Sequence, residues 1–310
     1  MVLSSIPSMK LPKKGSTAPP PVPTSELSNP ICYLPDLRAA FIRRHWLGVQ
    51  RFTFGTGYHS TFTTLPGWQC ARWADDASGT QSLTLTPVHD GAFASTVEKL
   101  VHAMQCGPGE VVCDLSMALD SEVAARMLKN GWRPMGRMFS AHLLPCGPAN
   151  HLALKAQPDG VVIREVLDRK TMADFIAVQE VAYRESYGAP PGATSQFYTA
   201  PQSLIGPDVV SYVLYIRTTE GTEIPARSAC LIRAEGLVSV ANDAAIPEVR
   251  GHHLSECLLR ALLLHAWLKF GVLECVYVTT PEARSIAARL GVPVVDRYRW
   301  MVPTVGEAEG

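Results

Sequence analysis

The sequence predicts an α/β (α+β) fold in which a mixed central sheet is flanked by helices, arranged as two tandem copies. Runs of β-branched residues alternate with segments whose apolar residues recur at helical spacing. The order helix, strand, helix, strand occurs twice, over about 90–144 and 254–301. The most similar local segments of the two passages are AARMLKNGW and IAARLGV. The alternative to a duplication is that any α/β chain repeats the order of helix and strand. Hydrophobic residues are 47% and charged residues 18% of the 310, which is typical of a compact chain.

In the first half, the elements follow a tail at 1–29 that is rich in serine, proline and lysine and cannot bury a core. We expect helices at 37–46, 90–105 and 122–129, two strands within 51–72, and further strands at 82–87, 111–115 and 135–144. Asp120 or Ser121 caps the third helix, which ends at Asn130 and Gly131.

In the second half, Asp168 can cap a helix over 169–187, and Pro281 suits the first turn of a helix over 281–290. The other expected elements are strands at 161–166, 209–217, 226–233, 237–246, 273–279 and 294–301, a short helical piece near 195–204 and a long helix at 254–270. The predicted domains are therefore 30–147 and 148–304, followed by a flexible tail at 305–310.

Charge and cysteine usage exclude several classes of protein. Lys+Arg and Asp+Glu both number 28, so no whole-chain field draws the protein to nucleic acid or to an anionic membrane. The 8 cysteines form no CxxC and no zinc spacing with histidine, so we expect no metal, reduced thiols and a cytoplasmic location. There is no run of about 18 uncharged apolar residues, and no membrane span is expected.

The first residues lack the apolar region of a secretory signal. They contain serine, proline and lysine and no acidic residue before Glu26, which leaves an organellar transit peptide as an alternative. Arginine is absent before Arg38, which favours a plain tail instead.

The most informative stretch is 237–271, which reads as a strand, a sharp turn and a long apolar helix. Pro247 ends the strand because it lacks a backbone donor, and Gly271 ends the helix. The helix begins near Leu254, directly after Arg250 and Gly251. A helix start presents unpaired N–H groups and the positive end of a dipole, so this turn is suited to bind phosphate.

Residues about 160–303 resemble the GNAT superfamily of N-acetyltransferases. The resemblance depends on AAIPEVRGHHLSECLL followed by LECVYVTTPEARSIAARLG. Members commonly show an Arg/Gln-x-x-Gly-x-Gly/Ala turn that opens a helix and holds the pyrophosphate of acetyl-CoA. The resemblance implies that the strand around Ala245 pairs with the pantetheine arm. It assigns the phosphate loop to these residues: Arg250, Gly251, His252, His253, Leu254 and Ser255.

Two positions depart from the family pattern. His253 and Ser255 stand where the family prefers glycine or alanine, and glycine there lets backbone approach phosphate closely. Many members also carry a tyrosine in the last helix as the acid for the leaving thiolate, and this place falls at Ala287. An asparagine that is common among members earlier in the same helix corresponds to Thr280 here. Tyr298, on the following strand, is a substitute candidate for the acid; the alternative is an aromatic residue that packs on the sheet.

Acetyl transfer to an amine requires a proton acceptor, because a lysine-like amine has a pKa near 10.4. Asp243 is the candidate base, since it lies on the strand expected to face the thioester, with Asn242 on the opposite face. The alternative is a structural role, in which Asp243 caps a turn or pairs with an arginine. Three aromatic residues are expected to border the acceptor site: Tyr183, Tyr187 and Tyr198.

These observations favour an acetyl-CoA-dependent N-acetyltransferase that acts on a primary amine of a small molecule or peptide, with no nucleic acid, membrane or metal partner. The first half lacks the phosphate turn, so we interpret it as a degenerate copy and expect one cofactor site per chain. A non-catalytic acyl-CoA-binding or scaffold protein is the alternative, favoured by Ala287 and His253. An acyltransferase with a longer acyl donor is a third hypothesis. The sequence identifies neither the acceptor amine nor the oligomeric state.

Overall fold

The computed structural model of the chain describes residues 35–56, 60–74, 81–88, 109–150, 158–188, 191–192, 194–195, 198, 203–251, 254–281 and 283–304. Several predictions fall outside these residues. They concern the tails at 1–29 and 305–310, the helix at 90–105, most of the helical piece at 195–204, and the positions of His252 and His253.

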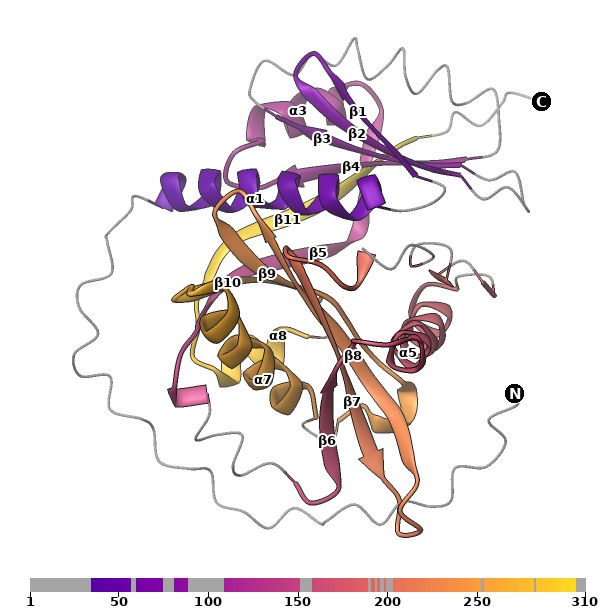
Figure 1. Ribbon diagram of the computed structural model, residues 1–310. Helices are drawn as coiled ribbons and strands as arrows, with labels where there is room; N and C mark the ends of the chain where they lie inside the picture. Colours follow the sequence, from indigo (N-terminus) through magenta and orange to yellow (C-terminus); the bar gives the residue numbers. More distant parts are fainter. Residues whose placement is uncertain are drawn as a thin grey trace.

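One mixed sheet of eleven strands runs through the described part of the chain, in the order β1-β2-β3-β4-β11-β5-β10-β9-β8-β7-β6 (Figure 1). The first half supplies β1 (Ser60–Leu65), β2 (Trp68–Ala74), β3 (Gln81–Pro87), β4 (Gly109–Ser116) and β5 (Trp132–Pro145). The second half supplies β6 (Val161–Glu165), β7 (Val209–Arg217), β8 (Glu223–Ala234), β9 (Leu237–Ala245), β10 (Glu274–Thr279) and β11 (Val294–Pro303). The β3–β4 and β9–β10 pairs are parallel, and the other pairs are antiparallel. The predicted fold class is confirmed.

The two halves exchange their last strands. β11 lies between β4 and β5, and its Tyr298 is paired with Ser116 on β4. β5 lies between β11 and β10, and its Leu144 is paired with Cys275 on β10. Each half therefore completes the sheet of the other, and Figure 1 shows β11, in yellow, reaching the strands of the first half. The predicted domain boundary at 147–148 does not divide the sheet, because strands from both sides of this boundary belong to the same eleven-stranded sheet.

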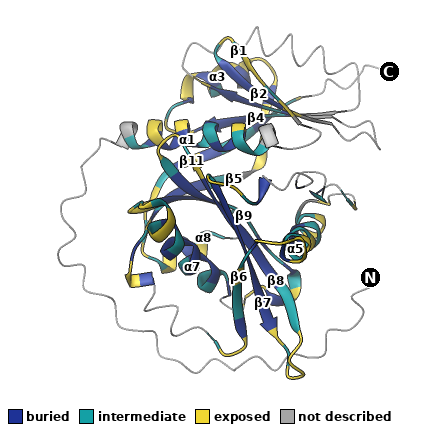
Figure 2. Ribbon diagram, viewed as in Figure 1, coloured by how far each residue is buried: buried dark blue, intermediate teal, exposed yellow. Residues whose placement is uncertain are grey.

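Helices cover both faces of the second half. α5 (Arg169–Tyr187) lies on one side of β8 and β9, and α7 (Leu254–Phe270) and α8 (Arg284–Arg289) lie on the other (Figure 1). The main core forms where the strands meet these helices, and the central strands are the most buried part of the chain (Figure 2). A smaller core lies under α3 (Ser121–Lys129) in the first half.

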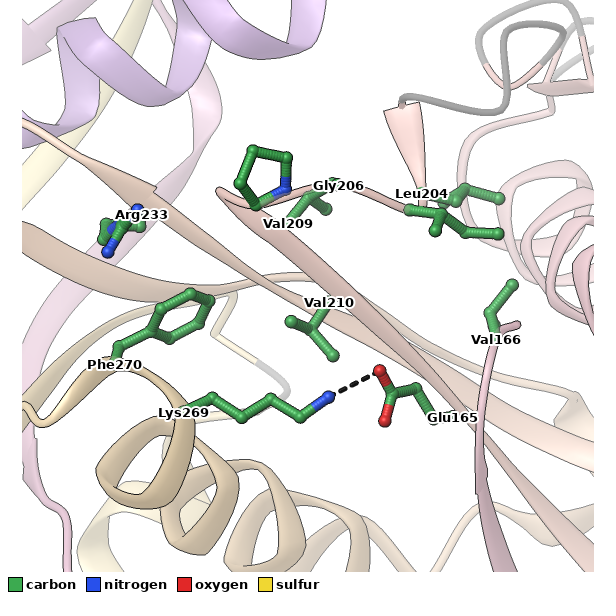
Figure 3. A pocket seen from close by; sticks show the side chains of 11 residues that line it. Glu165, Val166, Leu204, Gly206, Val209, Val210, Arg233, Lys269 and Phe270 are labelled. Carbon is green, nitrogen blue, oxygen red and sulfur yellow. Dashed lines mark hydrogen bonds and ion pairs between the residues drawn. The ribbon is translucent and has the colours of Figure 1, made fainter.

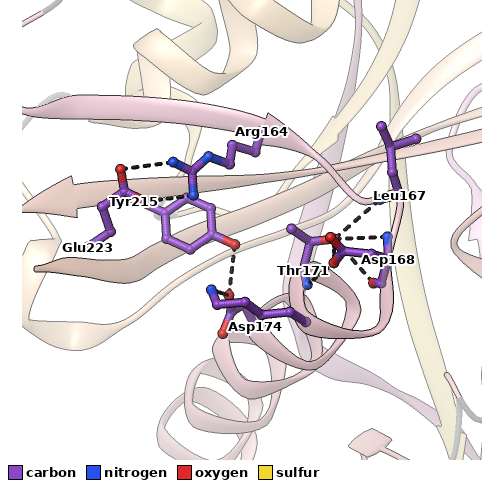
Figure 4. Close-up of polar contacts among 8 residues, drawn as sticks. Arg164, Leu167, Asp168, Thr171, Asp174, Tyr215 and Glu223 are labelled. Atoms are coloured by element: carbon purple, nitrogen blue, oxygen red, sulfur yellow. Dashed lines mark hydrogen bonds and ion pairs between the residues drawn. The ribbon is translucent and has the colours of Figure 1, made fainter.

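The start of α5 is fixed by a capping box (Figure 4). The Asp168 carboxylate accepts a 2.7 Å hydrogen bond from the Thr171 backbone N–H, and the Thr171 hydroxyl lies 3.3 Å from the Asp168 backbone N–H. These contacts satisfy donors that the first turn leaves unpaired. Asp174, one turn further along, accepts a 2.8 Å hydrogen bond from the Tyr215 hydroxyl of β7. The predicted cap at Asp168 is confirmed, and α5 is anchored to the sheet at this end.

The helix α1 (Pro35–Thr56) bridges the two halves, and it corrects the prediction of strand from residue 51 onward. Its buried His45 lies 2.8 Å through Nδ1 from the Ala234 carbonyl at the end of β8. A Cβ on Gly48 would lie 2.8 Å from the Ala234 Cβ, so glycine lets the helix approach this turn closely. Tertiary packing overrides the β propensity of the aromatic and threonine residues at 52–54.

Candidate functional site

The candidate site lies where β9 and β10 diverge. The parallel pairing of these strands begins at Val238 with Cys275 and ends at Val240 with Tyr277. Beyond these residues β9 continues to Ala245 and β10 to Thr279 without pairing to each other. Diverging strands leave backbone N–H and C=O groups facing a gap, and such groups need partners. The gap is therefore suited to an extended ligand that pairs with a strand edge.

A β-bulge in β9 decides which side chains face this gap. Ala241 pairs with Cys230, and Ala244 pairs with Ser228, so Asn242 and Asp243 together oppose the single residue between them on β8. Asn242 has φ of 52°, a left-handed conformation that asparagine tolerates better than most residues. Because strand side chains alternate, one extra residue moves all later side chains to the other face.

Without the bulge, Asp243 would share a face with Ala241. Ala241 packs against Cys230 in the cluster beneath α1. With the bulge, Asp243 instead shares the face of Val240 and Tyr277, since residues paired across a sheet point the same way. Asp243 thus lies on the predicted strand and faces the gap because of the bulge, not because of strict alternation along the strand.

A cleft of about 620 Å³ occupies the gap, which is within the usual size range of ligand pockets. One wall is the C-terminal end of α5, with Tyr183, Glu185 and Ser186, and the floor is β9 from 243 to 245. The opposite wall comes from the end of β10 and from α8 and includes these residues: Thr280, Ser285, Ile286 and Arg289. Arg227, Arg250, Gly251 and Ser255 also line it.

Asp243 is held at the cleft by two side chains from the neighbouring strands. The Arg227 guanidinium lies 2.6 Å from its Oδ1, and the Tyr277 hydroxyl donates a 2.7 Å hydrogen bond to its Oδ2. Burial, and then the nearby Asp243 charge, raise the pKa of Tyr277 well above its usual range, so this hydroxyl stays a donor. The Asp243 side chain is 15% exposed, which leaves it accessible from the cleft.

The predicted phosphate loop lies at one end of the cleft. A 3₁₀ turn (Pro247–Val249) follows β9, and Gly251 has φ of 85°, which favours glycine. A Cβ added there would meet none of the described residues within 4 Å. Ser255 lines the cleft in the first turn of α7, whereas Leu254 is buried in the core. Leu254 therefore contributes at most its backbone.

Two arginines bring positive charge to this end of the cleft. Arg250 Nη2 lies 3.3 Å from the Ala245 carbonyl and 3.4 Å from the Ser186 hydroxyl, so it spans the cleft from the loop to α5. Arg289 lines the cleft from α8 and lies 3.7 Å from Glu256. Together with the start of α7, these cations create a region suited to phosphate groups.

The structure corrects two predicted site residues. Tyr298 is 2% exposed on β11, and its ring lies 6.1 Å from that of Trp46 on α1, away from the cleft. Tyr198 is 7% exposed, and its ring meets Phe175 edge-on beneath α5. Both rings pack in the core, where burial raises the pKa of each hydroxyl well above its usual range.

Of the other predicted acceptor residues, Tyr183 lines the cleft, and Tyr187 is the last residue of α5. Ala287 lies on the buried side of α8 and is fully buried, so the position at which many GNAT members carry a tyrosine does not face the cleft. Two hydroxyls on this side of the cleft come instead from Thr280 and Ser285. Sequence reasoning missed Ser285, Arg227 and Tyr277, since nothing local distinguishes them from ordinary strand and helix residues.

The first half also contains two parallel strands that diverge, but an arginine side chain lies between them. β3 and β4 pair in parallel as far as Leu85 and Cys113 and then part. Arg43 of α1 lies between them, where Nη2 donates to the Pro87 carbonyl at 3.1 Å and to the Asp114 carbonyl at 3.2 Å. A side chain of α1 therefore occupies the divergence of β3 and β4 and satisfies backbone carbonyls on both strands. One cofactor site per chain stays a prediction.

Arg43 belongs to a buried polar network. It pairs with Asp120 at 2.9 Å, while Asp114 accepts a 2.6 Å hydrogen bond from the Trp46 indole. Burial raises the pKa of Asp114, and it raises the pKa of Asp120 to about 6, against the opposing charge of Arg43. A third carboxylate, Asp296 of β11, accepts a 2.5 Å hydrogen bond from the Ser116 hydroxyl. The network ties the exchanged strand to α1 and β4.

A second cavity, of about 350 Å³, lies at the far end of the sheet between β6, β7 and the end of α7 (Figure 3). Its charged side chains are already paired: Lys269 with Glu165 at 2.5 Å, and Arg233 with Asp208 at 2.7 Å. It lies at the C-terminal end of α7, where the helix dipole disfavours anions. The β9–β10 cleft, with its diverging strands and phosphate-suited loop, is therefore the candidate site.

Neither metals nor membrane spans are indicated in the described part of the chain. No three His, Cys, Asp or Glu side chains among the described residues are grouped so as to hold a metal ion. None of the helices described above is long and apolar enough to cross a membrane.

A mixed sheet with diverging parallel strands and a phosphate-suited helix start defines the GNAT class of fold. A GCN5-related N-acetyltransferase from Kribbella flavida is similar at TM-score 0.58 and 15% identity, over 87% of this chain and 97% of that chain. One from Sphaerobacter thermophilus is similar at TM-score 0.52 and 15% identity, over 86% of this chain and 92% of that chain.

The glucosamine N-acetyltransferase region of a fungal multi-domain GH3 β-N-acetylglucosaminidase is similar at TM-score 0.54 and 12% identity. This match covers 87% of this chain and 37% of that chain. No protein-family model and no curated protein matches the sequence. The chain thus has the GNAT fold, and the likeness extends over both halves.

Proposed function

We propose that the chain is an acetyl-CoA-dependent N-acetyltransferase that acts on a primary amine of a small molecule or peptide. The observation that carries this proposal is the β9–β10 cleft, which has a phosphate-suited loop at one end and the carboxylate of Asp243 on its floor. The structural neighbours support the class, since those from Kribbella flavida and Sphaerobacter thermophilus are GCN5-related N-acetyltransferases.

The cleft would bind acetyl-CoA through features already present. Backbone N–H groups at Gly251 and the start of α7, with Arg250 and Arg289, would hold the phosphates. The unpaired edge of β9 near Ala245 would pair with the pantetheine arm. Arg250 covers the Ala245 carbonyl, so its side chain would exchange that contact for the phosphates on binding.

The chemistry is a direct attack of the amine on the thioester. Asp243 would take a proton from the acceptor ammonium, the neutral nitrogen would form the C–N bond, and the C–S bond would break. A strand N–H would stabilise the developing oxyanion. The nitrogen would lose its second proton as the amide forms, and this proton would pass through water or through the Thr280 or Ser285 hydroxyl to the leaving thiolate, whose ordinary pKa is near 8.5. Positioning of both reactants supplies much of the acceleration.

A non-catalytic acyl-CoA-binding protein is the second candidate. Two observations favour it: Ala287 is buried where many GNAT members carry the tyrosine acid, and both oxygens of Asp243 are already engaged by Arg227 and Tyr277. Under this alternative, Asp243 is a structural residue of the sheet.

Thiol release separates the two candidates. The protein is incubated with acetyl-CoA and a panel of primary amines that includes amino sugars, polyamines and peptides, and free CoA is measured over time. Amine-dependent release that is lost in Asp243→Asn supports the transferase. Binding of acetyl-CoA without release across the panel supports the binding protein.

A further inference from the structure

The bulge that presents Asp243 is held from outside the cleft by Gln179. This residue lies in the middle of α5 and is fully buried. Its Nε2 donates hydrogen bonds to the Asn242 carbonyl at 2.5 Å and to the Ser228 hydroxyl at 2.8 Å. A buried polar group is costly unless it is paired, and both contacts of Gln179 are made by Nε2, whereas its Oε1 has no hydrogen-bond partner among the described residues. The Nε2 donor therefore accounts for a polar side chain at this position of the helix.

The bulge needs such a donor. A bulge interrupts the ladder and leaves backbone groups without their usual strand partner. The Asn242 carbonyl lies at this interruption, and it receives its hydrogen bond from α5 rather than from β8. An unpaired buried carbonyl would destabilise the bulge and favour regular alternation. Regular alternation would place Asp243 on the face of Ala241, away from Tyr277 and the cleft.

The two contacts of Gln179 also bracket the bulge. Ser228 pairs with Ala244 on the far side of the bulge, and Asn242 lies within it. One amide group therefore fixes β9 and β8 to α5 at the place where the strand changes face. Arg227, next to Ser228 in sequence, then reaches the Asp243 carboxylate at 2.6 Å.

We infer that Gln179 is a positioning residue for Asp243: its amide holds the Asn242 bulge and thereby presents the Asp243 carboxylate to the cleft. The inference depends on the proposed function for its kinetic consequence, although the structural link is measurable without activity. Gln179 is not among the residues that line the cleft, so it acts through Asp243 and not on a bound molecule.

Three variants of the full chain test the link. Gln179→Met keeps the length and removes the amide, and Gln179→Glu keeps the shape while replacing the donor with an acceptor. Gln50→Met is the matched control: Gln50 is also a buried glutamine, 7% exposed, and its amide donates to Asp114 in the first half. All three lose a buried hydrogen bond, and only the first two touch the bulge.

The first readout is amide hydrogen exchange of the peptide that covers residues 238–246. Gln179→Met and Gln179→Glu are expected to raise its exchange rate by about 10-fold or more, and Gln50→Met is expected to leave it unchanged. If exchange is unaltered in both Gln179 variants, or rises equally in the control, the inference is wrong. This arm does not require the protein to be an enzyme, so it separates failure of the inference from failure of the proposed function.

The second readout is a double-mutant cycle on kcat for amine acetylation. Asp243→Asn is expected to lower kcat by about 100-fold or more, and Gln179→Met by about 10- to 100-fold, because misplacement of a reacting group is costly. If Gln179 acts through Asp243, the double variant is no more than about 3-fold slower than Asp243→Asn. If the fold-loss in kcat of the double variant equals the product of the two single losses, Gln179 has a general structural role and the inference is wrong. An unchanged kcat in Gln179→Met would also overturn it.

Discussion

The Tyr277 hydroxyl donates a 2.7 Å hydrogen bond to the Asp243 carboxylate across the point where β9 and β10 diverge. The two residues reach each other because the bulge at Asn242 turns Asp243 onto the face of β10 that carries Tyr277. Arg227 holds the other carboxylate oxygen at 2.6 Å, so the orientation of Asp243 is set by two neighbouring strands. The cleft and the candidate base thus arise from one local irregularity.

Tyr277→Phe should lower kcat for amine acetylation by about 10-fold or more, because hydrogen bonds to charged groups contribute about 1.5–3 kcal/mol. The affinity for acetyl-CoA should stay within about 3-fold, since the hydroxyl is buried behind the carboxylate. Steady-state kinetics and calorimetry on the same preparation measure both. A variant with full kcat would show that the orientation of Asp243 does not matter for turnover.

Gly251→Glu should weaken acetyl-CoA binding by about 10-fold or more, because it places bulk and negative charge where the phosphates are expected. A Cβ at Gly251 meets none of the described residues within 4 Å, so the substitution causes no clash within the chain itself, although the φ of 85° is unfavourable for a side chain. Acetyl-pantetheine, which lacks the nucleotide phosphates, is the matched ligand and should bind the variant and the wild type alike. If the variant loses affinity equally for acetyl-CoA and acetyl-pantetheine, or loses none, the phosphates do not bind at this loop.

A fragment that contains only 148–310 should fail to fold, because it removes β5 from beside β10. The β10 edge would expose unpaired backbone groups next to the cleft, and such edges promote aggregation. Circular dichroism and size-exclusion chromatography of the fragment, compared with the full chain, provide the measurement. A soluble, cooperatively folding fragment would show that the strand exchange is dispensable.

Asp120 should make stability depend on pH. Burial raises its pKa from 3.8 to about 6 in the folded chain, so the folded state binds this proton more tightly than the unfolded state. The tighter binding of this proton adds to the free energy of unfolding below about pH 4, and this contribution is lost as the pH rises to about 6. For a shift of about two units this amounts to about 3 kcal/mol.

The measurement is the unfolding free energy of the wild type minus that of Asp120→Asn, and this difference should be about 2 kcal/mol more positive at pH 4 than at pH 7. Other carboxylates, such as Asp168 and Glu223, have a lowered pKa and act in the opposite direction, but they cancel in this difference. A difference that does not change with pH, or that grows as pH rises, would contradict the assignment.

The sequence predicted the elements of the second half well because their signals are local. Asp168 and Thr171 form the predicted cap, and β7, α5 and α7 have the expected bounds. The helix α8 begins at Arg284, later than Pro281 suggested, and α1 continues to Thr56 through residues expected to be strand. In α1, packing against the other half outweighs local propensity.

The parts that could not be predicted depend on contacts between distant segments. Nothing local indicates that β11 will lie between β4 and β5 rather than beside β10. Asn242 tolerates a left-handed conformation, but the hydrogen bond that its carbonyl accepts from Gln179, 63 residues away in the sequence, has no local signal. For the same reason Tyr298, expected near the cleft, lies buried against Trp46. The acceptor and the cytoplasmic location stay predictions.

The central claim is that the β9–β10 cleft binds acetyl-CoA. Titration of the full chain with acetyl-CoA in a calorimeter tests it most directly, with Gly251→Glu in the same experiment. We predict one site per chain with a dissociation constant between about 1 μM and 1 mM, weakened by about 10-fold or more in the variant. A folded wild-type chain that shows no binding at about 1 mM acetyl-CoA would contradict the account.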